Sequence, residues 1–294
     1  MNKTVKLFTH TDLDGVGCAV LAYHAFGRDN VDVEYCDYSN VNDKISAYLD
    51  EDVRHSEIYI TDISVNEAVA KRIDRDNYNT YWMLIDHHKT AAWLNTYEWA
   101  LVLSIDGDNT KTSGTSLFHE YLGNVLPEFS EAVRSYDTWD WTLTGDQAAK
   151  DLNDLLYLIG RDRFVDRFTR NISVELTAEE RLLLDVERSR IDAYIRGKST
   201  AITIRQINGY RVGIVFADRY QSELGNHIVG ERDDIDLVAM IDPAKGVSYR
   251  SKGDIDVGLF AKAYAGGGHK NAAGSQVSDE QRAAIIDIIF GGVC

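Results

Sequence analysis

Apolar segments rich in β-branched residues recur in the first half of the chain, and a histidine or an aspartate follows each of them. Such segments are typical of strands buried in a sheet. The segments and the residues that follow them are Thr4–Thr9 before His10, Glu57–Thr61 before Asp62, and Tyr81–Ile85 before Asp86. Small apolar residues at 16–22 indicate a helix packed on the first strand. The pattern predicts an α/β fold with a parallel sheet that delivers polar residues to one edge.

A long helical pattern divides the chain into two predicted domains. Residues 177–180 form a capping box, and apolar residues continue at helical spacing as far as Gly197. We therefore expect a linker helix between a parallel-sheet domain and a smaller α/β domain. The expected bounds are residues 1–176 for the first domain, 177–198 for the linker helix and 199–294 for the second domain.

Strand and helix patterns are mixed in the second predicted domain. The strands are expected at residues 200–204, 210–216, 236–241 and 246–250, and the helices at 222–230, 257–264 and 279–290. We interpret Gly266, Gly267 and Gly268 as a glycine-rich turn. Three glycines let backbone N–H groups approach an anion closely, and His269 adds a donor. Arg250, at a strand end, is suited to bind a phosphate through two hydrogen bonds.

The composition is that of an ordinary globular protein, with 294 residues of which 44% are hydrophobic and 27% charged. No stretch reaches the roughly 18 apolar residues of a membrane span, so we expect a cytoplasmic protein without a membrane partner. Cys18, Cys36 and Cys294 are widely spaced, which favours reduced thiols over disulfides. The sequence has no P-loop and no nucleophile elbow, which disfavours those two classes of enzyme.

Two motifs are candidates for metal binding: His10-x-Asp12-x-Asp14-Gly15 and Asp86-His87-His88. Side chains two apart in an extended segment point the same way, so those of the first motif can converge. Mixed carboxylate and imidazole ligands suit Mn²⁺, Mg²⁺, Fe²⁺ or Zn²⁺, and an oxygen-rich set favours the harder ions. A single aspartate at a strand end is more often a turn or cap residue. So many such groups without a metal would repel one another, and the whole pattern indicates a two-metal hydrolytic centre.

The same motifs resemble those of the DHH phosphoesterase superfamily. The matching segments are His10-x-Asp12-x-Asp14-Gly15, Ile60-Thr61-Asp62, Asp86-His87-His88 and Ser135-Tyr136-Asp137. Residues 249–251 and 266–274 resemble the DHH-associated substrate-binding domain. The sequences of residues 12–18 and 86–91 are most similar to those of the oligoribonucleases of the NrnB type, or nano-RNases.

This resemblance implies two divalent metal ions, for which we expect Mn²⁺, with Mg²⁺, Co²⁺ or Fe²⁺ as alternatives. The implied ligands are His10, Asp12 and Asp62 for one ion, and Asp14, Asp62, His87 and Asp137 for the other. Asp62 would bridge the ions and His88 would face the scissile phosphate. Asp86 would orient a ligand imidazole. His88, Asp86 and Asp62 are therefore the implied catalytic residues.

The activity that the resemblance implies is the release of nucleoside 5′-monophosphates from the ends of short oligoribonucleotides and dinucleotides. The implied active site lies in the cleft between the two domains. The implied substrate-binding residues are Arg250, Gly266, Gly267, Gly268, His269 and His88. A net charge of −16 also argues for short substrates, because proteins that bind long nucleic acids usually present a basic stripe.

Other activities fit the same chemistry. They are a 3′,5′-bisphosphonucleotide phosphatase, a linear or cyclic dinucleotide phosphodiesterase and a single-strand DNA exonuclease, which usually carries extra domains. A nucleotide-binding regulator is the alternative outside enzymes, and a homodimer is compatible with the sequence. Five aromatic residues near the motifs are candidates to stack on bases: Trp93, Tyr97, Trp99, Trp139 and Trp141. Core packing is favoured for each of them.

Overall fold

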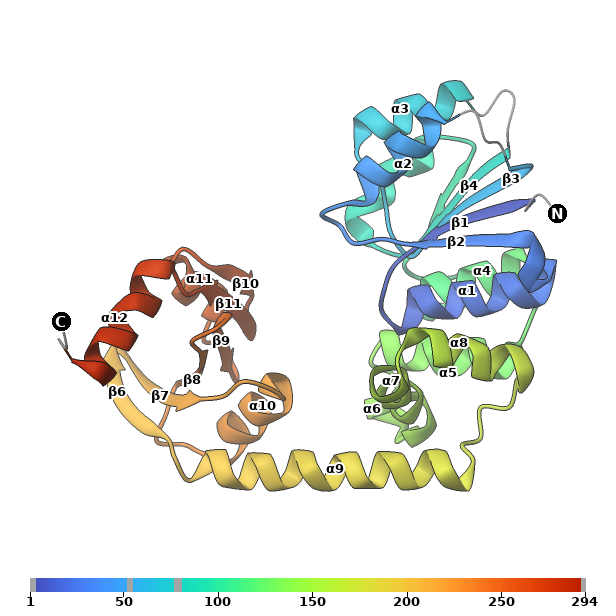
Figure 1. The fold of residues 1–294 in the computed structure, drawn as a ribbon. Coiled ribbons are helices and arrows are strands. Elements are labelled where there is room, and N and C mark those ends of the chain that lie inside the picture. The colour runs from blue at the N-terminus through green and yellow to red at the C-terminus, as the bar shows by residue number, and fades with distance from the viewer. Residues whose placement is uncertain (1–3, 52–54, 77–80, 292–294) are drawn as a thin grey trace. The chain divides into compact units, whose positions relative to one another are not determined.

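The computed structural model describes residues 4–51, 55–76 and 81–291. These residues form an α/β fold of two compact units, and the boundary between the units lies between Leu184 and Asp185 (Figure 1). The predicted fold class, with a parallel sheet in the first part and a second sheet in the other, is confirmed. Cys18 and Cys36 are buried and free, whereas Cys294 lies outside the described residues.

A five-stranded parallel sheet, counted over the described residues, forms the centre of the N-terminal unit in the order β2-β1-β3-β4-β5. The strands are β1 (Val5–Thr9), β2 (Val31–Tyr35), β3 (Glu57–Thr61), β4 (Tyr81–Asp86) and β5 (Ala100–Val102). The sequence pattern indicated β1, β3 and β4. It did not indicate β2, in which acidic residues alternate with apolar ones, or β5, which has only three residues.

Helices cover both faces of this sheet (Figure 1). They are α1 (Leu13–Phe26), α2 (Val41–Asp50), α3 (Glu67–Asp76), α4 (Gly114–Tyr121), α5 (Pro127–Asp137), α6 (Trp141–Thr144), α7 (Gln147–Ile159) and α8 (Arg161–Arg170), with the 3-10 helices η1 (Arg28–Asn30) and η2 (Lys89–Thr96). Leu7 packs with α1, α4, α5, α7 and α8, whereas Phe8 packs on the opposite face with α2 and α3. Because neighbouring residues of a strand face opposite ways, both faces are buried.

The register of the sheet aligns the ends of its three central strands. Thr9 of β1 lies opposite Thr61 of β3, and Thr61 lies opposite Ile85 of β4. The Thr61 hydroxyl donates to that of Thr9 at 2.9 Å, and Thr9 in turn donates to the carbonyl of Gly15 at 2.8 Å. The next residue of each strand is one of the polar residues predicted for the site. The register therefore brings these residues to one edge of the sheet.

A six-stranded mixed sheet, within the described part of the chain, forms the C-terminal unit in the order β10-β11-β9-β8-β7-β6. Its elements are α9 (Ala178–Ser199), β6 (Thr203–Ile207), β7 (Tyr210–Phe216), α10 (Gln221–Glu231), β8 (Leu237–Asp242), β9 (Gly246–Ser251), α11 (Val257–Lys262), β10 (Gly267–His269), β11 (Ala272–Gln276) and α12 (Asp279–Phe290). The boundary between the two units falls within α9. No helix among the described residues is long and apolar enough to cross a membrane.

The capping box predicted before α9 is present. Thr177 accepts a hydrogen bond from the Glu180 N–H at 3.2 Å, and the Glu180 carboxylate accepts one from the Thr177 N–H at 2.8 Å. Glu180 also pairs with Arg167 of α8, with 3.0 Å between Oε1 and Nε. This pairing fixes the start of α9 against the N-terminal unit.

The interpretation of residues 266–268 as a turn is wrong, because Gly267 and Gly268 belong to strand β10. β10 pairs with β11 in antiparallel register, with Gly268 opposite Ala273. Gly268 has a φ of 145°, and a Cβ there would lie 2.6 Å from the carbonyl oxygen of Ala272. Glycine is needed here because the two strands approach closely.

We predict that Gly15→Ala destabilises the protein by about 1–3 kcal/mol, the usual cost of overpacking. A Cβ at Gly15 would lie 2.3 Å from the carbonyl oxygen of His10, whereas a Cβ at Gly107 would have nothing within 4 Å. Gly107→Ala is therefore the matched control in thermal unfolding. Equal melting temperatures for the two variants would show that the backbone contact at Gly15 is not a constraint.

Candidate metal centre

The six predicted metal ligands lie together at the carboxyl ends of the central strands. His10 follows β1, Asp62 follows β3, and His87 follows β4. The described residues contain three overlapping groups of donor atoms that lie within 4.8 Å of one another: His10, Asp12 and Asp62; Asp14, His87 and Asp137; and Asp62, Asp86, His87 and His88. The first two groups match the implied ligand sets with one exception. Asp62, implied as a ligand of both ions, belongs to the first group but not to the second.

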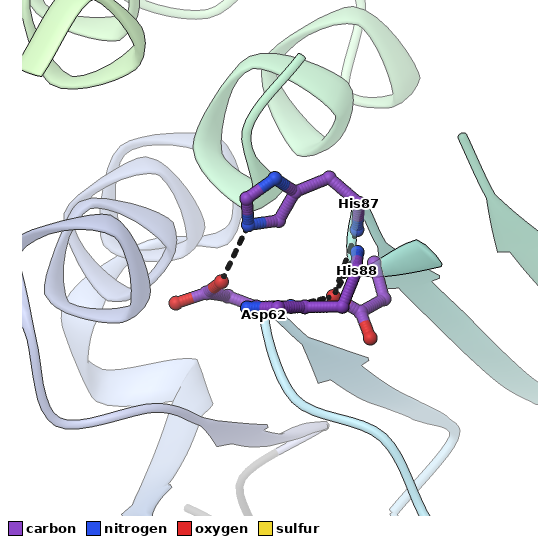
Figure 2. Close-up of side chains that lie close together, drawn as sticks. Asp62, His87 and His88 are labelled. Carbon is purple, nitrogen blue, oxygen red and sulfur yellow. Dashed lines mark hydrogen bonds and ion pairs between the residues drawn. The ribbon is translucent and has the colours of Figure 1, made fainter. Parts of the chain in front are cut away.

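Asp62 lies between the two histidines of these groups. Its Oδ2 is 3.7 Å from Nδ1 of His10. Its Oδ1 is 3.3 Å from Nε2 of His87, a contact shown in Figure 2. The side chain is 1% exposed, and the backbone has a left-handed φ of 56°. Such a φ is rare for a residue other than glycine and is often found at functional sites. The N–H of Asp62 donates to the carbonyl of Ile85 at 3.0 Å, which holds the residue at the end of the sheet.

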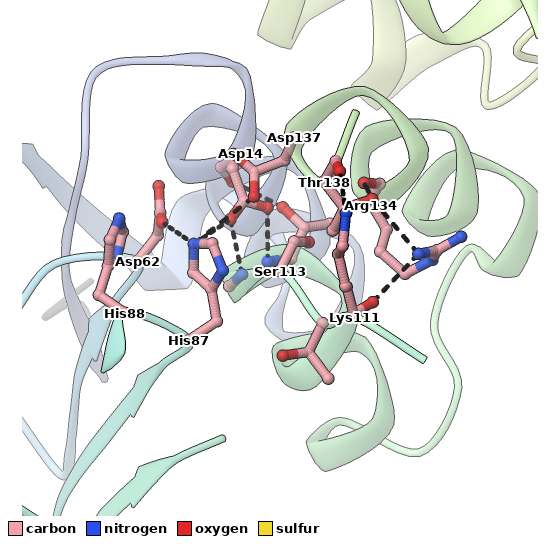
Figure 3. A network of polar contacts seen from close by, with 12 residues as sticks. Asp14, Asp62, His87, His88, Lys111, Ser113, Arg134, Asp137 and Thr138 are labelled. Atoms are coloured by element: carbon pink, nitrogen blue, oxygen red, sulfur yellow. Dashed lines mark hydrogen bonds and ion pairs between the residues drawn. The ribbon is translucent and has the colours of Figure 1, made fainter. Parts of the chain in front are cut away.

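Asp14 is held by the N-terminus of α4. Its carboxylate accepts hydrogen bonds from the N–H groups of Gly114 at 2.6 Å and Thr115 at 2.8 Å (Figure 3). The helix dipole also stabilises a negative charge at this position. A Cβ at Gly114 would lie 2.5 Å from Cβ of Asp62, so only glycine lets α4 come this close. The sequence gave no signal for this role of Gly114.

Asp12 and Asp137 complete the cluster from helix ends. Asp12 caps α1, accepting from the Gly15 N–H at 3.1 Å, and its other oxygen lies 2.9 Å from Nδ1 of His10. Asp137 is the last residue of α5, and its Oδ2 lies 3.6 Å from Nε2 of His87 (Figure 3). Helices and strands therefore fix the backbone of every predicted ligand.

The aspartates of the cluster are crowded and carry unusual pKa values. Burial raises the pKa of Asp62 well above its usual value, and the neighbouring Asp14 and Asp12 raise it further. Burial, followed by the charges of Asp14 and Asp12, raises the pKa of Asp137 to about 8. Without a cation nearby, these shifts favour the protonated forms of Asp62 and Asp137.

Four buried polar atoms of the site make no well-aligned hydrogen bond among the described residues, although carboxylate oxygens lie near the two nitrogens: Nδ1 of His10, Oδ2 of Asp62, Oδ2 of Asp86 and Nε2 of His87. Buried polar atoms are nearly always paired, so such a group of unpaired atoms calls for another ligand. Carboxylate oxygens and imidazole nitrogens are donors to divalent metal ions. The cluster fits a metal site on these grounds.

His88 is oriented from both sides of its ring. Oδ1 of the buried Asp86 lies 2.7 Å from Nδ1 of His88 and also accepts from the backbone N–H of His87 at 2.7 Å. This contact raises the pKa of His88. We expected Asp86 to orient the imidazole of a metal ligand. In the structure, Asp86 instead contacts the imidazole of His88, which is not one of the implied ligands. On the other side, Oη of Tyr38 lies 3.2 Å from Nε2 of His88.

Tyr38 was not identified from the sequence. Its ring lies 5.3 Å from that of His10 and 6.1 Å from that of His88, so it borders both histidines. The residue follows β2, the strand that the sequence pattern did not indicate. A lone tyrosine in a polar loop carries no signal that distinguishes it from other surface residues.

The predicted substrate residues belong to the C-terminal unit, apart from His88. His269 lies opposite Ala272, and Ala272 lies opposite Arg250, so the three residues share one row across β10, β11 and β9. Directly opposed residues face the same side of a sheet, and the small Ala272 leaves space between the other two. Gly266 and Gly267 line a surface cavity of about 440 Å³.

Arg250 carries a charge that no described carboxylate pairs with. Its guanidinium donates to the Tyr249 carbonyl and to the Ser222 hydroxyl, both at 2.9 Å. Gly225 of α10 makes room for the side chain, because a Cβ there would lie 2.5 Å from Cγ of Arg250. Burial lowers the pKa of Arg250, but arginine remains protonated in proteins. Lys270, by contrast, pairs with Asp254 at 3.0 Å.

The expectation that the aromatic residues pack in the core holds for only some of them. Trp99 is 3% exposed, but Trp93 is 40% and Trp139 is 64% exposed. The expectation is wrong for Trp93 and Trp139. Trp139 has a left-handed φ of 65°, which turns the chain away from the core directly after α5.

Comparison with known proteins identifies the class of this fold. A family model described as the DHHA1 domain matches residues 200–290. The structure is similar to that of the exonuclease RecJ bound to manganese, with a TM-score of 0.62, 14% identity and coverage of 97% of this chain and 88% of that chain. It is also similar to the pGpG-specific phosphodiesterase PggH from Vibrio cholerae, with a TM-score of 0.55, 14% identity and coverage of 97% of each chain. The fold is that of the DHH phosphoesterases.

A sequence relative narrows this class to a family. Oligoribonuclease NrnB of Bacillus subtilis (strain 168) is 37% identical over 292 residues, which cover 93% of this chain and 73% of the relative. The chain therefore belongs to the NrnB family of DHH phosphoesterases. The resemblance inferred from the motifs is confirmed.

We predict that the metal-free protein loses stability as the pH rises from about 4 to about 8. The raised pKa of Asp137, about 8, means that the folded chain keeps a proton that the unfolded chain has already lost. Stability from this group is present at low pH and lost as the pH approaches the folded-state pKa. Asp137→Asn removes the titration, so its melting temperature should decline less over this range than that of the wild type.

Mn²⁺ should raise the melting temperature of the wild type, and more at pH 8 than at pH 6, because protons compete with the metal at lower pH. An ion present at a hundredfold excess over its Kd stabilises the fold by about 2.7 kcal/mol. Thermal unfolding with and without Mn²⁺ measures both effects. A melting temperature that does not respond to Mn²⁺ at either pH would contradict the metal assignment.

Proposed function

We propose that this protein hydrolyses short oligoribonucleotides and dinucleotides to nucleoside 5′-monophosphates, using two divalent metal ions. The observation that carries the proposal is the convergence of six histidine and aspartate ligands at one sheet edge. Family membership supports it, because the 37% identical relative is an oligoribonuclease. The choice of Mn²⁺, the number of ions, a homodimer and a cytoplasmic location are parts of this proposal.

In this proposal Asp62 would be a ligand of both ions. His10 and Asp12 complete one ion's ligands, and Asp14, His87 and Asp137 complete the other's. When bound, the ions supply Lewis acidity and lower the pKa of water towards neutrality. Hydrogen bonds from two N–H groups at the start of α4 fix the position of the Asp14 carboxylate.

His88 acts on the substrate in this proposal, and Asp86 positions it. The raised pKa of His88 increases the fraction of cationic imidazole at neutral pH. With Nδ1 directed at Asp86, Nε2 is the atom that can donate to a phosphoryl oxygen. The hydroxyl of Tyr38 lies within hydrogen-bonding distance of the same Nε2 atom.

Substrate binding is assigned to Arg250, Gly266, Gly267, Gly268 and His269. The free charge of Arg250 and the exposed backbone of the glycines suit one or two phosphates. A chain with a net charge of −16 has little to attract a long polyanion, so short substrates are favoured.

A time course with Mn²⁺ and end-labelled RNA of two, five and twenty-four nucleotides tests this proposal. We expect rapid release of mononucleotides from the two short RNAs and slow attack on the long one. Matched DNA and a 3′,5′-bisphosphonucleotide are the comparison substrates. Consumption of only the bisphosphonucleotide or only long DNA would overturn the substrate assignment, and consumption of none under several metals would favour a regulator.

The Asp62→Asn variant should lose turnover by more than about a hundredfold, since even partners that merely orient metal ligands contribute 10- to 100-fold. The substitution keeps the shape of the side chain and removes its charge. Metal content, measured on the same preparation, should fall below that of the wild type. Near-normal turnover with full metal content would contradict the bridging role of Asp62.

Arg250→Ala should raise the KM for a dinucleotide with little change in kcat, because the guanidinium is assigned to uniform substrate binding. Arg211→Ala is the matched control, since Arg211 already pairs with Asp236 at 2.6 Å. Steady-state kinetics on both variants separates the two parameters. A loss of kcat at unchanged KM in Arg250→Ala would show that the assignment is wrong.

A further inference from the structure

Trp139 is an exposed tryptophan close in sequence to a proposed metal ligand. It lies two residues after Asp137, and its side chain is 64% exposed. Its backbone adopts the left-handed region, with a φ of 65°. A large aromatic residue in this region is strained, and its exposure forgoes the gain of burial. Such outliers persist where the surrounding structure enforces them, and they are found most often at functional sites.

A network of polar contacts enforces this conformation. The Arg134 guanidinium donates to the carboxylate of Asp140 at 2.8 Å, and the ammonium of Lys111 donates to the carbonyl of Thr138 at 2.9 Å (Figure 3). Arg134 also donates to the carbonyl of Lys111 at 3.0 Å. These contacts fix the residues on both sides of Trp139, so its exposed position is built into the turn.

The indole of Trp139 is the outer member of an aromatic stack. Its ring lies 6.2 Å from that of Trp141, with 30° between the planes, and the Trp141 ring lies 6.1 Å from that of Tyr136, with 13° between the planes. The Nε1 atom of Trp141 is buried without a hydrogen-bond partner among the described residues. Tyr136 precedes Asp137 in α5, so the stack is attached to the metal cluster through the backbone.

We propose that the outer face of Trp139 stacks on a nucleobase of the oligonucleotide whose phosphodiester lies at the metal centre. The inference rests on the proposed function and adds the residue that binds a base. Trp139 and Asp137 are separated by two Cα–Cα steps, which span at most about 7.6 Å. The Trp139 ring is therefore attached to the backbone close to a proposed metal ligand, and in this proposal a base of the bound nucleotide extends to it.

Stacking also provides binding energy that does not depend on the net charge of the protein. With a net charge of −16, the protein cannot rely on general electrostatic attraction to hold a nucleotide. An aromatic surface binds a base without a positive charge, and it accepts any base because every base has a π-face. We therefore expect Trp139 to strengthen binding with little preference among the four bases.

A cycle of changes in protein and substrate tests this inference. The substrates are a ribodinucleotide and two analogues in which one or the other nucleotide lacks its base, all measured with Mn²⁺. Trp139→Ala should lower kcat/KM for the full dinucleotide about 5- to 150-fold, which corresponds to about 1–3 kcal/mol of stacking. Removal of one of the two bases should cost the wild type a similar factor. For that analogue, Trp139→Ala should cause little further loss of kcat/KM, because the substitution and the missing base remove the same contact.

Two further variants separate stacking from structural damage. Trp139→Phe keeps an aromatic face and should retain most of the kcat/KM for the dinucleotide. Leu143→Ala removes an apolar side chain that is 84% exposed in the neighbouring helix α6 and should behave like the wild type. Additive losses for both analogues, or equal losses in the Ala and Phe variants, would overturn the role of Trp139. If the wild type does not cleave the dinucleotide at all, the proposed function fails instead.

Discussion

The crowding of aspartates at one edge of the parallel sheet is the constraint on which the rest of the site depends. Burial and mutual repulsion raise the pKa values of Asp62 and Asp137, so the carboxylates cannot all be ionised without a countercharge. Part of the compensation is built into the fold, because two N–H groups at the start of α4 bind Asp14. Other buried oxygen and nitrogen atoms of the site make no well-aligned hydrogen bond among the described residues, and divalent cations are the groups that satisfy such a set.

Close packing of the backbone makes this crowding possible. Gly15 and Gly114 occur where any side chain would collide, one with the backbone of His10 and the other with Asp62. The aligned ends of β1, β3 and β4 then bring three segments of the sequence to one place. The ligands are therefore positioned before a metal binds, which reduces the ordering cost of binding. The aromatic stack at Trp139 extends the same preorganised edge towards solvent.

Much of this could be predicted from the sequence because the signals are local. Strand β3 and helix α12 were predicted with the bounds that the structure has, because the sequence pattern of each is local. The convergence of His10 and Asp62 followed from strand ends in a parallel sheet. Asp137 was predicted as a site residue only from the family resemblance. The sequence of a helix end does not indicate which edge of the sheet that end lies against.

The parts that could not be predicted depend on tertiary contacts. Residues 267–269 form a strand because β11 lies beside them, although three glycines in sequence suggest a turn. Tyr38 reaches His88 from a loop whose position depends on β2, and β2 has no clear pattern. The exposure of Trp139 depends on the bridge between Arg134 and Asp140, which a sequence alone does not reveal.

In the proposed function, two ions share Asp62. Electron paramagnetic resonance of the protein titrated with Mn²⁺ tests it most directly, because ions about 3.5–4 Å apart in a two-metal site are magnetically coupled. We predict that two Mn²⁺ ions bind per chain and give the spectrum of a coupled pair, which Asp62→Asn converts to that of isolated ions. A single bound ion per chain, or two ions without coupling, would contradict the shared-ligand account.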